Sequence, residues 1–271
     1  MSVAELDCPT RPRHRWSPQE PQRGYGVPAP SGRRSTEELR RLALWAQEAL
    51  VGASAGQVLA WAYAEFGDSL AVASSMADAV LPHLAATVYA GVRPDDSAPE
   101  PPVIFLDTGY HFEETLATRD EVARRLPVRV LSITPTRSVQ QQDEDFGSDL
   151  FNRDASACCR MRKVEPLRQA LTGYQAWASG VRRSDSPTRA QTPLISWDER
   201  HEVVKLNPLA AWSDAHVEAY IQRHQVPVNP LIAQGYPSIG CGPCTLRPLL
   251  GADPRSGRWA GTTKTECGLH L

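Results

Sequence analysis

Apolar residues recur along the chain in two patterns that alternate with each other. Short apolar runs bounded by turn residues are typical of buried strands, and such runs occur at 69–74 and, most clearly, at 101–107. Two further strands are expected at 128–132 and 174–180. Between them, an apolar residue at every third or fourth position predicts helices over 77–90, 113–126 and 159–171. This alternation predicts an α/β fold, a mostly parallel sheet with helices on both of its faces.

Two further helices are expected before the first strand. Ser35 and Glu38 have the spacing of a capping box, and helical periodicity continues to residue 50. A second helix is expected over 54–66, ended by Gly67. After the fourth strand, the pattern predicts a hairpin-like region over 194–206 and a helix over 213–224.

Composition divides the chain into three parts. Residues 1–34 are rich in Pro, Arg and Gly without any period, which predicts a flexible tail. Residues 35–250 contain the strand and helix signals and are expected to form the α/β domain. Residues 251–271 are polar and contain glycine, and we expect them to form a mobile C-terminal segment.

Polar residues directly follow several of the predicted strands. Ser74 follows the first strand, Asp107 and Thr108 follow the second, and Arg182 and Arg183 follow the fourth. Ligands of open parallel sheets bind beyond the carboxyl ends of the strands, so these residues are candidates for one site. Hydroxyls and paired arginines suit a nucleotide or another phosphorylated ligand. The alternative is that these segments simply end the strands.

Overall composition argues against several functional classes. With 41% hydrophobic and 22% charged residues, the 271-residue chain has the composition of a soluble globular protein, and its net charge of −2 provides no basic field for nucleic acid. No apolar run reaches the ~18–20 residues of a membrane span, and the start of the chain lacks the apolar core of a secretory signal. A cytoplasmic location is therefore expected, where six cysteines favour metal ligands or catalytic thiols over disulfides.

Four of the cysteines occur in two close pairs. Cys158 and Cys159 are adjacent in ACCRMRK, and Cys241 and Cys244 frame CGPC. Brought together by folding, four thiolates make a site for zinc or for an iron–sulfur cluster. CGPC is also the redox dithiol of thioredoxin-like proteins, but there it follows a strand. Here it follows the turn-like QGYPSIG, and a redox dithiol would leave the adjacent pair unexplained. The four-cysteine site is the favoured interpretation.

Cys267 stands apart from these pairs, in the terminal segment KTECGLHL. A thiol in a mobile, polar segment is accessible, and Lys264 and His270 could favour its thiolate. This is the environment of a nucleophile. The alternative, a solvent-exposed thiol without a role, is equally compatible with these residues alone.

In combination, these motifs resemble the assimilatory sulfonucleotide reductases, in the bacterial adenylyl-sulfate (APS) reductase branch. The resemblance covers about residues 35–271 and is carried by CCRMRKVEPL, GVRRSDSPTRA, KLNPLAAWSDAHVEAYIQRHQVPVNPLIAQGYPSIGCGPCT and ECGLH, with weaker support from FLDTGYHFEET. It implies an adenine-nucleotide α-hydrolase-like fold. Because the branch with both cysteine pairs binds a 4Fe–4S cluster and uses APS, it implies a cluster held by Cys158, Cys159, Cys241 and Cys244.

The resemblance also assigns roles to other residues. Cys267 would be the nucleophile, on a catalytic segment spanning 251–271, and Lys163 would lie between cluster and substrate. Arg255 and Arg258 would hold the phosphosulfate. In the nucleotide pocket, the matching residues are Ser74, Arg182 and Arg183.

The reaction implied by the resemblance belongs to sulfate assimilation and proceeds in two steps. The thiolate of Cys267 would attack the sulfur of APS, giving an S-sulfocysteine and AMP. A second thiol would then release sulfite. The chain stops at Leu271, so an external dithiol, thioredoxin, is the expected reductant. The sequence is also compatible with a homo-oligomer.

Three other functions are weighed against this one. The first is reduction of the 3′-phosphorylated substrate PAPS, against which both cysteine pairs argue. The second is an ATP-using adenylating or thiolating enzyme of the same fold, but this would carry an SGGxDS-type loop, which SSMADA matches poorly. The third is a zinc-binding module without enzymatic activity, which would leave ECGLH without a purpose.

Overall fold

The computed structural model describes residues 33–93, 99–262 and 264–269. The helices of this part are α1 (Thr36–Ala49), α2 (Ala55–Phe66), α3 (Val80–Val92), α4 (Glu113–Arg125), α5 (Val139–Phe146), α6 (Leu150–Arg153), α7 (Ala155–Cys159), α8 (Glu165–Leu171) and α9 (Asp214–His224). The strands are β1 (Leu70–Ala73), β2 (Pro102–Leu106), β3 (Arg129–Ile133), β4 (Ala176–Ser179), β5 (Ile195–Asp198) and β6 (Val203–Leu206). The predicted tail over 1–34 lies almost entirely outside the described residues.

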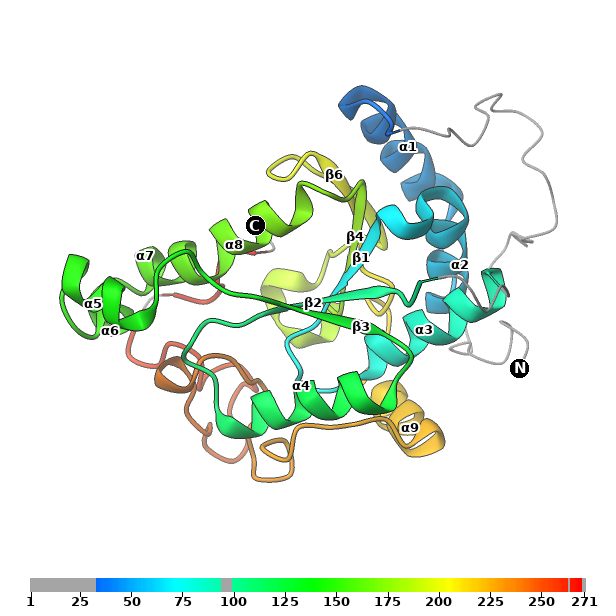
Figure 1. The fold of residues 1–271 in the computed structure, drawn as a ribbon. Coiled ribbons are helices and arrows are strands. Elements are labelled where there is room, and N and C mark those ends of the chain that lie inside the picture. The colour runs from blue at the N-terminus through cyan, green and yellow to red at the C-terminus, as the bar shows by residue number, and fades with distance from the viewer. Residues whose placement is uncertain (1–32, 94–98, 263, 270–271) are drawn as a thin grey trace.

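The strands form one sheet in the order β3-β2-β1-β4-β6-β5 (Figure 1). All neighbouring pairs are parallel except β5 and β6, which are antiparallel. The predicted mostly parallel sheet is therefore confirmed, and the hairpin-like region over 194–206 is the antiparallel edge. The chain reverses direction across the sheet between β1 and β4, and ligands of such sheets bind at this point, beyond the strand ends.

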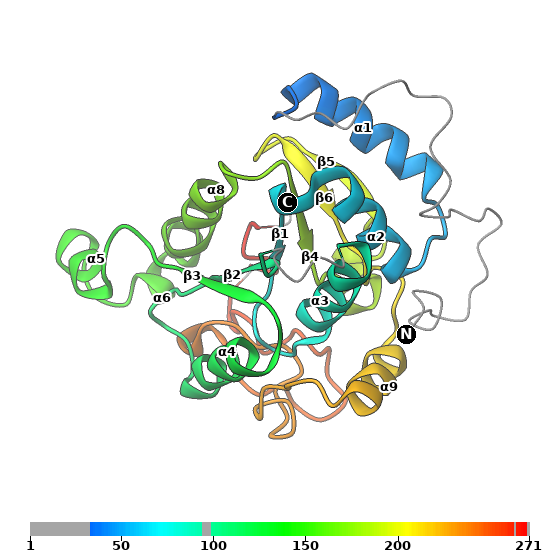
Figure 2. The ribbon, with the colours of Figure 1, turned by 45° about the vertical axis from the view of Figure 1, so that its right-hand side comes forward.

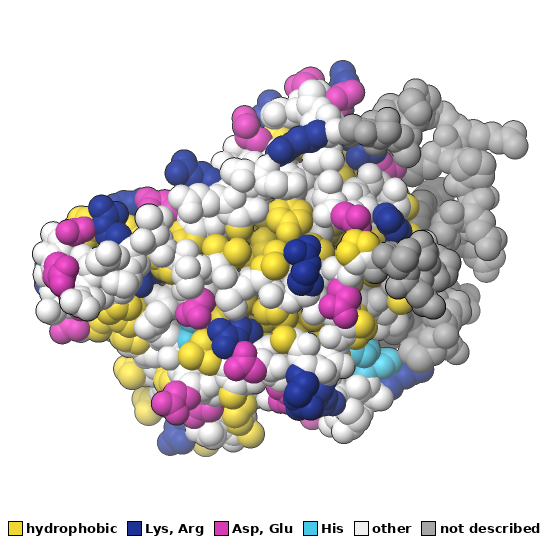
Figure 3. Space-filling model, in the orientation of Figure 1, with side chains coloured by type: hydrophobic (Ala, Val, Ile, Leu, Met, Phe, Trp, Pro, Cys, Tyr) yellow, Lys and Arg dark blue, Asp and Glu magenta, His cyan; other side chains and the backbone are white. Residues whose placement is uncertain are grey.

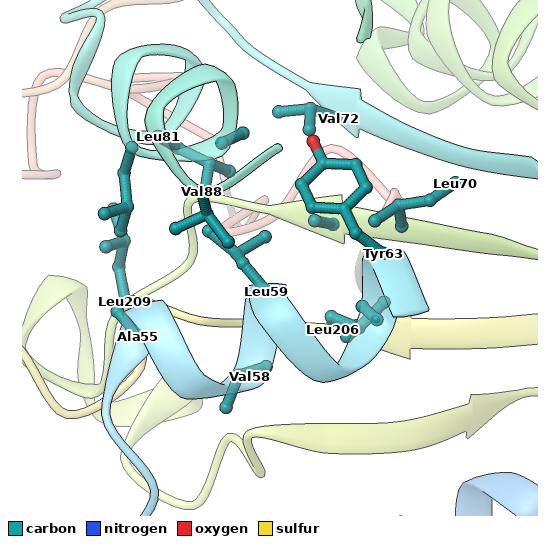
Figure 4. Close-up of a cluster of buried hydrophobic side chains, with 14 of the residues drawn as sticks. Ala55, Val58, Leu59, Tyr63, Leu70, Val72, Leu81, Val88, Leu206 and Leu209 are labelled. Atoms are coloured by element: carbon teal, nitrogen blue, oxygen red, sulfur yellow. The ribbon is translucent and has the colours of Figure 1, made fainter. Parts of the chain in front are cut away.

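Successive side chains of the central strands pack into two cores on opposite faces of the sheet. On β1, Leu70 and Val72 join the core formed with α1, α2, α3 and α9, and Figure 4 shows Tyr63 of α2 reaching toward both. Ala71 faces the smaller core on the other side, which is built with α8 (Figure 2). Leu269 packs against this second core. The end of the chain is therefore anchored to the face of the sheet that α8 covers.

Local sequence signals account for the helix boundaries on the first face. Ser35 and Ser54 each form a complete capping box at the start of α1 and α2, as their sequences predict. Gly67 ends α2 at a φ of +50°, in the region that favours glycine. Pro82 is the third residue of α3, in the first turn, where its missing amide hydrogen costs no intrahelical bond.

The predicted helix over 159–171 differs from the observed one. The helix begins four residues earlier because Asp154 caps it, accepting from the amides of Ser156 at 3.0 Å and Ala157 at 2.8 Å. A π-helical turn over Arg160–Val164 then separates α7 from α8. The adjacent cysteines therefore lie at the end of α7 and not at the start of a helix, where the predicted bounds of 159–171 would put Cys159. Helices α5 and α6 were not predicted either.

The surface carries charges of both signs. On the face shown in Figure 3, Lys and Arg side chains alternate with Asp and Glu, without a large patch of one sign. No helix of the described residues is long and apolar enough to cross a membrane.

Candidate active site

A hollow beside the loop that follows β2 collects side chains from separate stretches of the chain. Its lining comprises Tyr110, Phe151, Ala155, Cys158, Cys159, Arg162, Lys163, Cys241, Pro243, Cys244, Arg258 and Trp259. All four cysteines predicted as metal ligands are in this lining, and none of them forms a disulfide. The fold therefore brings the two sequence-distant pairs to one place with all four thiols available.

The loop that carries the second pair is fixed to the end of β2. The thiol of Cys241 lies 3.3 Å from the hydroxyl of Thr108. The amide of Gly242 donates to the carbonyl of Tyr110 at 2.7 Å. These contacts hold the loop at the edge of the sheet where ligands of parallel sheets bind.

Arg162 joins the first pair to the same edge. Its side chain is buried and donates to the carbonyl of Thr108 at 2.5 Å and to the side-chain oxygen of Gln142 at 3.0 Å. The guanidinium also lies 5.2 Å from the ring centroid of Tyr110. A buried cation is tolerated because its donors are used, so Arg162 is a structural connection between α7 and the loop after β2.

Removing this connection should cost stability. We expect Arg162→Met to lower the free energy of unfolding by about 2–4 kcal/mol, because it leaves buried acceptors unpaired. Urea unfolding measures the loss. The control is Arg160→Met in the same turn, whose side chain is 62% exposed and lies 3.8 Å from Glu165. That change should stay within about 0.5 kcal/mol. Equal losses in both variants would contradict the role given to Arg162.

The thiols of the hollow raise one another's pKa. Burial, followed by the charges of the other three thiolates, raises the pKa of Cys158 to about 12. Burial and the charges of Cys241 and Cys159 raise the pKa of Cys244 to about 11. Thiols crowded in this way favour a bound cation that compensates their charge. Among the described residues, no group of three or more His, Cys, Asp or Glu side chains is arranged to hold a metal ion as the side chains stand.

Lys163 lines the hollow and interacts electrostatically both with these thiols and with the terminal one. Burial lowers its pKa, but the charges of Cys241, Cys267 and Cys159 raise it further than burial lowers it. At Cys241, burial raises the pKa, yet the charge of Lys163, its hydrogen bond and the Thr108 hydroxyl lower it overall. Lys163 therefore connects the cysteine hollow electrostatically to Cys267.

The thiol of Cys267 is free and partly buried. The residues on its C-terminal side are held in place by two contacts. Arg200 donates to the carbonyl of Gly268, the next residue. Leu269 packs in the smaller core together with Trp177. In the structure, this part of the predicted mobile segment is docked on the sheet.

Of the two residues expected to favour the Cys267 thiolate, Lys264 and His270, the structure describes only Lys264. The ammonium of Lys264 donates to the hydroxyl of Ser156 at 3.2 Å and lies 5.6 Å from the ring centroid of Trp259. Its positive charge acts to lower the pKa of Cys159, although burial raises that pKa overall. His270 lies outside the described residues.

Arg255 contacts the terminal segment, and Arg258 lines the hollow. Arg255 donates to the carbonyl of Thr265 at 3.1 Å and to the carboxylate of Glu266 at 3.2 Å. Arg258 lines the hollow, 4.6 Å from the ring centroid of Trp259. Its Nε is buried without a hydrogen-bond partner in the described part of the chain. Arg258 thus lies in the same hollow as the four cysteines, and Arg255 contacts the segment that carries Cys267.

The residues predicted for a nucleotide pocket lie beyond the ends of two neighbouring strands, β1 and β4. Ser74 follows β1, and its hydroxyl accepts from the amide of Met76 at 3.1 Å. Arg182 follows β4 and donates to Asp185 at 3.0 Å. Arg183 is exposed and donates to the carbonyl of Thr192 at 2.8 Å, so its side chain is occupied away from the cysteine hollow.

Sequence reasoning missed charged residues on both sides of the site. Asp78 lies near Arg182, and burial raises the pKa of its carboxyl. Its position five residues after β1 was the available signal. Glu266 and Arg189 form a buried ion pair beside Cys267, with a shortest distance of 2.8 Å. Both occur within motifs that carry the family resemblance, but nothing in their spacing shows that they pair.

Comparison with known proteins places the chain in one family. Residues 69–247 match the phosphoadenosine phosphosulfate reductase domain. An adenosine 5'-phosphosulfate reductase of Mycolicibacterium smegmatis is 54% identical over 238 residues, which is 88% of this chain and 97% of that protein. Proteins of the same name from Mycobacterium tuberculosis (52% identical; 86% of this chain, 95% of that protein) and Streptomyces coelicolor (50%; 88% and 97%) are also similar.

Solved structures agree on the fold. A phosphoadenylyl-sulfate (PAPS) reductase from Candida auris in complex with phosphate superposes with a TM-score of 0.63 at 26% identity, covering 80% of this chain and all of that one. An FMN adenylyltransferase from Candida glabrata reaches 0.53 at 14% identity over 78% of this chain and 73% of its own, which shows the fold alone. From its domain match and its relatives, the chain belongs to the phosphoadenosine phosphosulfate reductase domain family.

Proposed function

We propose that this protein reduces adenylyl sulfate (APS) to sulfite and AMP in sulfate assimilation. The observation that carries the proposal is that Lys163 lines the cysteine hollow and interacts electrostatically with Cys241 there and with the terminal Cys267. A lysine placed in this way suits an anionic substrate held between the two groups. The relatives that are about half identical to this chain are named adenosine 5'-phosphosulfate reductases.

The cysteine hollow fits a 4Fe–4S cluster, which we propose as its occupant. Its four ligands would be Cys158, Cys159, Cys241 and Cys244, which line one hollow and are free of disulfides. A four-iron cluster is larger than one ion and holds its cysteines further apart than zinc does, so it does not require the thiols to converge on a point. When bound, the cluster would supply compensating charge for the thiolates and a rigid link between the two pairs.

The first chemical step falls to Cys267. Its thiolate attacks the sulfur of APS, a sulfur–sulfur bond forms, and the bond from that sulfur to the phosphate oxygen breaks, its electron pair leaving with AMP. Negative charge grows on the leaving phosphate, and we assign Lys163, Arg255 and Arg258 to stabilise it. The unpartnered Nε of Arg258 is a donor still available for a substrate oxygen.

The second step needs two electrons from outside the described site. A thiolate of an external dithiol, which we propose is thioredoxin, attacks the sulfur of Cys267 and expels sulfite. The second thiol of the dithiol then breaks the mixed disulfide and restores the Cys267 thiol. The sulfur thereby gains two electrons, and the dithiol becomes a disulfide. Free cysteines throughout the described residues suit a cytoplasmic setting, which we also propose.

The remaining assignments extend the same proposal. Residues 35–250 would bind the nucleotide and the cluster, while 251–271 would act as the catalytic segment. Ser74, Arg182 and Arg183 would serve the nucleotide end, at the edge of β1 and β4, where Asp78 adds a carboxyl that sequence reasoning did not select. Of these, Arg183 must leave the carbonyl of Thr192 to reach a ligand.

Steady-state turnover tests the proposal. Protein purified without oxygen is assayed with thioredoxin and either APS or PAPS, and its iron, sulfide and zinc contents are measured. The expected result is turnover of APS, little turnover of PAPS, and equal amounts of iron and sulfide. Preferred turnover of PAPS would contradict the proposed substrate and identify PAPS as the substrate instead. A colourless protein that contains zinc and turns over neither substrate would support the non-enzymatic alternative.

A further inference from the structure

The residue before Cys267 makes the densest set of polar contacts in the terminal segment. Glu266 is 9% exposed, and its two carboxylate oxygens accept from Nε and Nη2 of Arg189 at 2.9 and 2.8 Å. Nη2 of Arg255 reaches the same carboxylate at 3.2 Å, and the hydroxyl of Thr188 lies at 3.4 Å. A bidentate arginine pair of this kind fixes geometry as well as contributing energy.

The partner of Glu266 is itself held in place. Nη1 of Arg189 donates to Asp185 at 3.1 Å, and Asp185 in turn accepts from the backbone amide of Arg182 at 2.9 Å. Arg182 lies three residues after the end of β4. The carboxylate of Glu266 is therefore anchored, through two ion pairs, to the connection of short 3-10 turns that follows the central strand β4.

Cys267 lies between two anchors. Glu266 holds its N-terminal side through Arg189, and the carbonyl of Gly268 is held on its other side by Arg200. Because consecutive residues are joined by planar peptide bonds, fixing both neighbours restricts the positions that the Cys267 thiol can adopt. The Glu266 anchor is the stronger one, because both of its partners are charged and the contact is bidentate, whereas Arg200 donates to a neutral carbonyl.

We propose that Glu266 is a positioning residue that latches the terminal segment, so that Cys267 rests at the site before substrate arrives. This inference depends on the proposed role of Cys267 as the nucleophile. Glu266 does not contact the reacting atoms; it acts through the chain position of its neighbour. Its two arginines have different tasks: Arg189 is the permanent partner, and Arg255 is shared with the anionic substrate.

The sharing of Arg255 follows from the distances. Transfer of Arg255 to a substrate oxygen removes a contact of 3.2 Å from Glu266 and leaves the bidentate contact with Arg189. The segment can therefore stay docked while the substrate binds. In the substrate-free protein, the carboxylate of Glu266 forms an ion pair with Arg255. An anionic substrate replaces that carboxylate as the partner of Arg255.

Alkylation of Cys267 in the substrate-free holoprotein tests the latch without using the reaction. Iodoacetamide is added without oxygen, and labelling of the terminal peptide is followed by peptide mapping. We expect Glu266→Gln to speed labelling of Cys267 about tenfold, because the amide cannot replace a bidentate carboxylate. Arg189→Gln should have the same effect. The double variant should be labelled no faster than either single variant, because all three variants remove the same ion pair, that between Glu266 and Arg189.

The matched control is Glu165→Gln, which removes a carboxylate near Cys158 and Cys159 that does not belong to the terminal segment. This carboxylate lies 3.8 Å from the guanidinium of Arg160. Its labelling rate should stay within about twofold of the wild-type rate. In turnover, Glu266→Gln should lower kcat without raising the KM for APS, since Arg255 keeps its charge and loses a competing carboxylate.

Three results would overturn the latch. One is unchanged labelling in both folded single variants, with circular dichroism verifying the fold. Another is equal acceleration in Glu165→Gln, which would indicate general loosening. The third is additive acceleration in the double variant. If the protein fails to reduce APS but labelling follows the expected order, the proposed function fails while the latch stands.

Discussion

Cys267→Ser should abolish turnover and leave the metal site intact. A serine hydroxyl is a far weaker nucleophile than a thiolate, so we expect kcat to fall by roughly 10⁴-fold or more. Cys267 is not in the lining of the cysteine hollow, so iron and sulfide contents should match those of the wild-type protein. The two measurements, activity and metal content, are made on the same preparation.

The matched control is Cys8→Ser, which removes a cysteine to which no role is assigned. It should keep both activity and iron. Residual turnover of Cys267→Ser above about one per cent of the wild-type rate would contradict the nucleophile assignment, because no other nucleophile is proposed. Loss of iron from this variant would indicate that the terminal thiol belongs to the metal site.

Lys163→Ala should separate catalysis from metal binding. Lys163 interacts electrostatically with both Cys241 and Cys267, and its proposed task is to stabilise charge on the substrate. Loss of such a preorganised cation should lower kcat by about 10²–10³-fold. Iron content should change little, because the four thiols that would bind iron remain.

The control for Lys163→Ala is Arg160→Ala, which removes a cation of the same turn whose side chain is 62% exposed. It should lower turnover by less than about twofold, since exposed charges are screened by solvent. Lys163→Arg keeps the charge with a different shape and should recover part of the lost rate. If Lys163→Ala loses its iron together with its activity, the lysine is structural, and the proposed contact with substrate is wrong.

Much of the fold follows from periodicity in the sequence. The apolar runs of β1, β2 and β4 form strands that are buried on both faces, as Ala71 and Val72 are on opposite sides of the sheet. The strand β3 lies at the edge of the sheet and remains partly exposed. The capping pattern of Ser35 and Glu38 sets the start of α1 directly. Such signals are local, and a single sequence contains them in full.

Features that depend on distant partners were not predictable in the same way. The π turn over Arg160–Val164 lies in an apolar and basic stretch that reads as ordinary helix. It belongs to the segment whose Arg162 reaches Thr108, more than fifty positions earlier. The partner of Arg162 is invisible in the sequence.

The candidate site divides along the same line. The cysteine pairs could be found from spacing, and their convergence on one hollow is what the fold adds. Glu266 and Arg189 are 77 positions apart, and nothing in either segment indicates their ion pair. Charged pairs that form between loops leave no periodic trace, so they become visible only in the structure.

Transfer of the sulfonate group to the protein tests the central claim most directly. Reductant-free protein that holds its metal is mixed, without oxygen, with APS or with PAPS, and its intact mass is measured before peptide mapping. The account predicts one sulfonate adduct, on Cys267, with APS alone. An adduct with PAPS alone, an adduct on another residue, or no adduct with either nucleotide would contradict it.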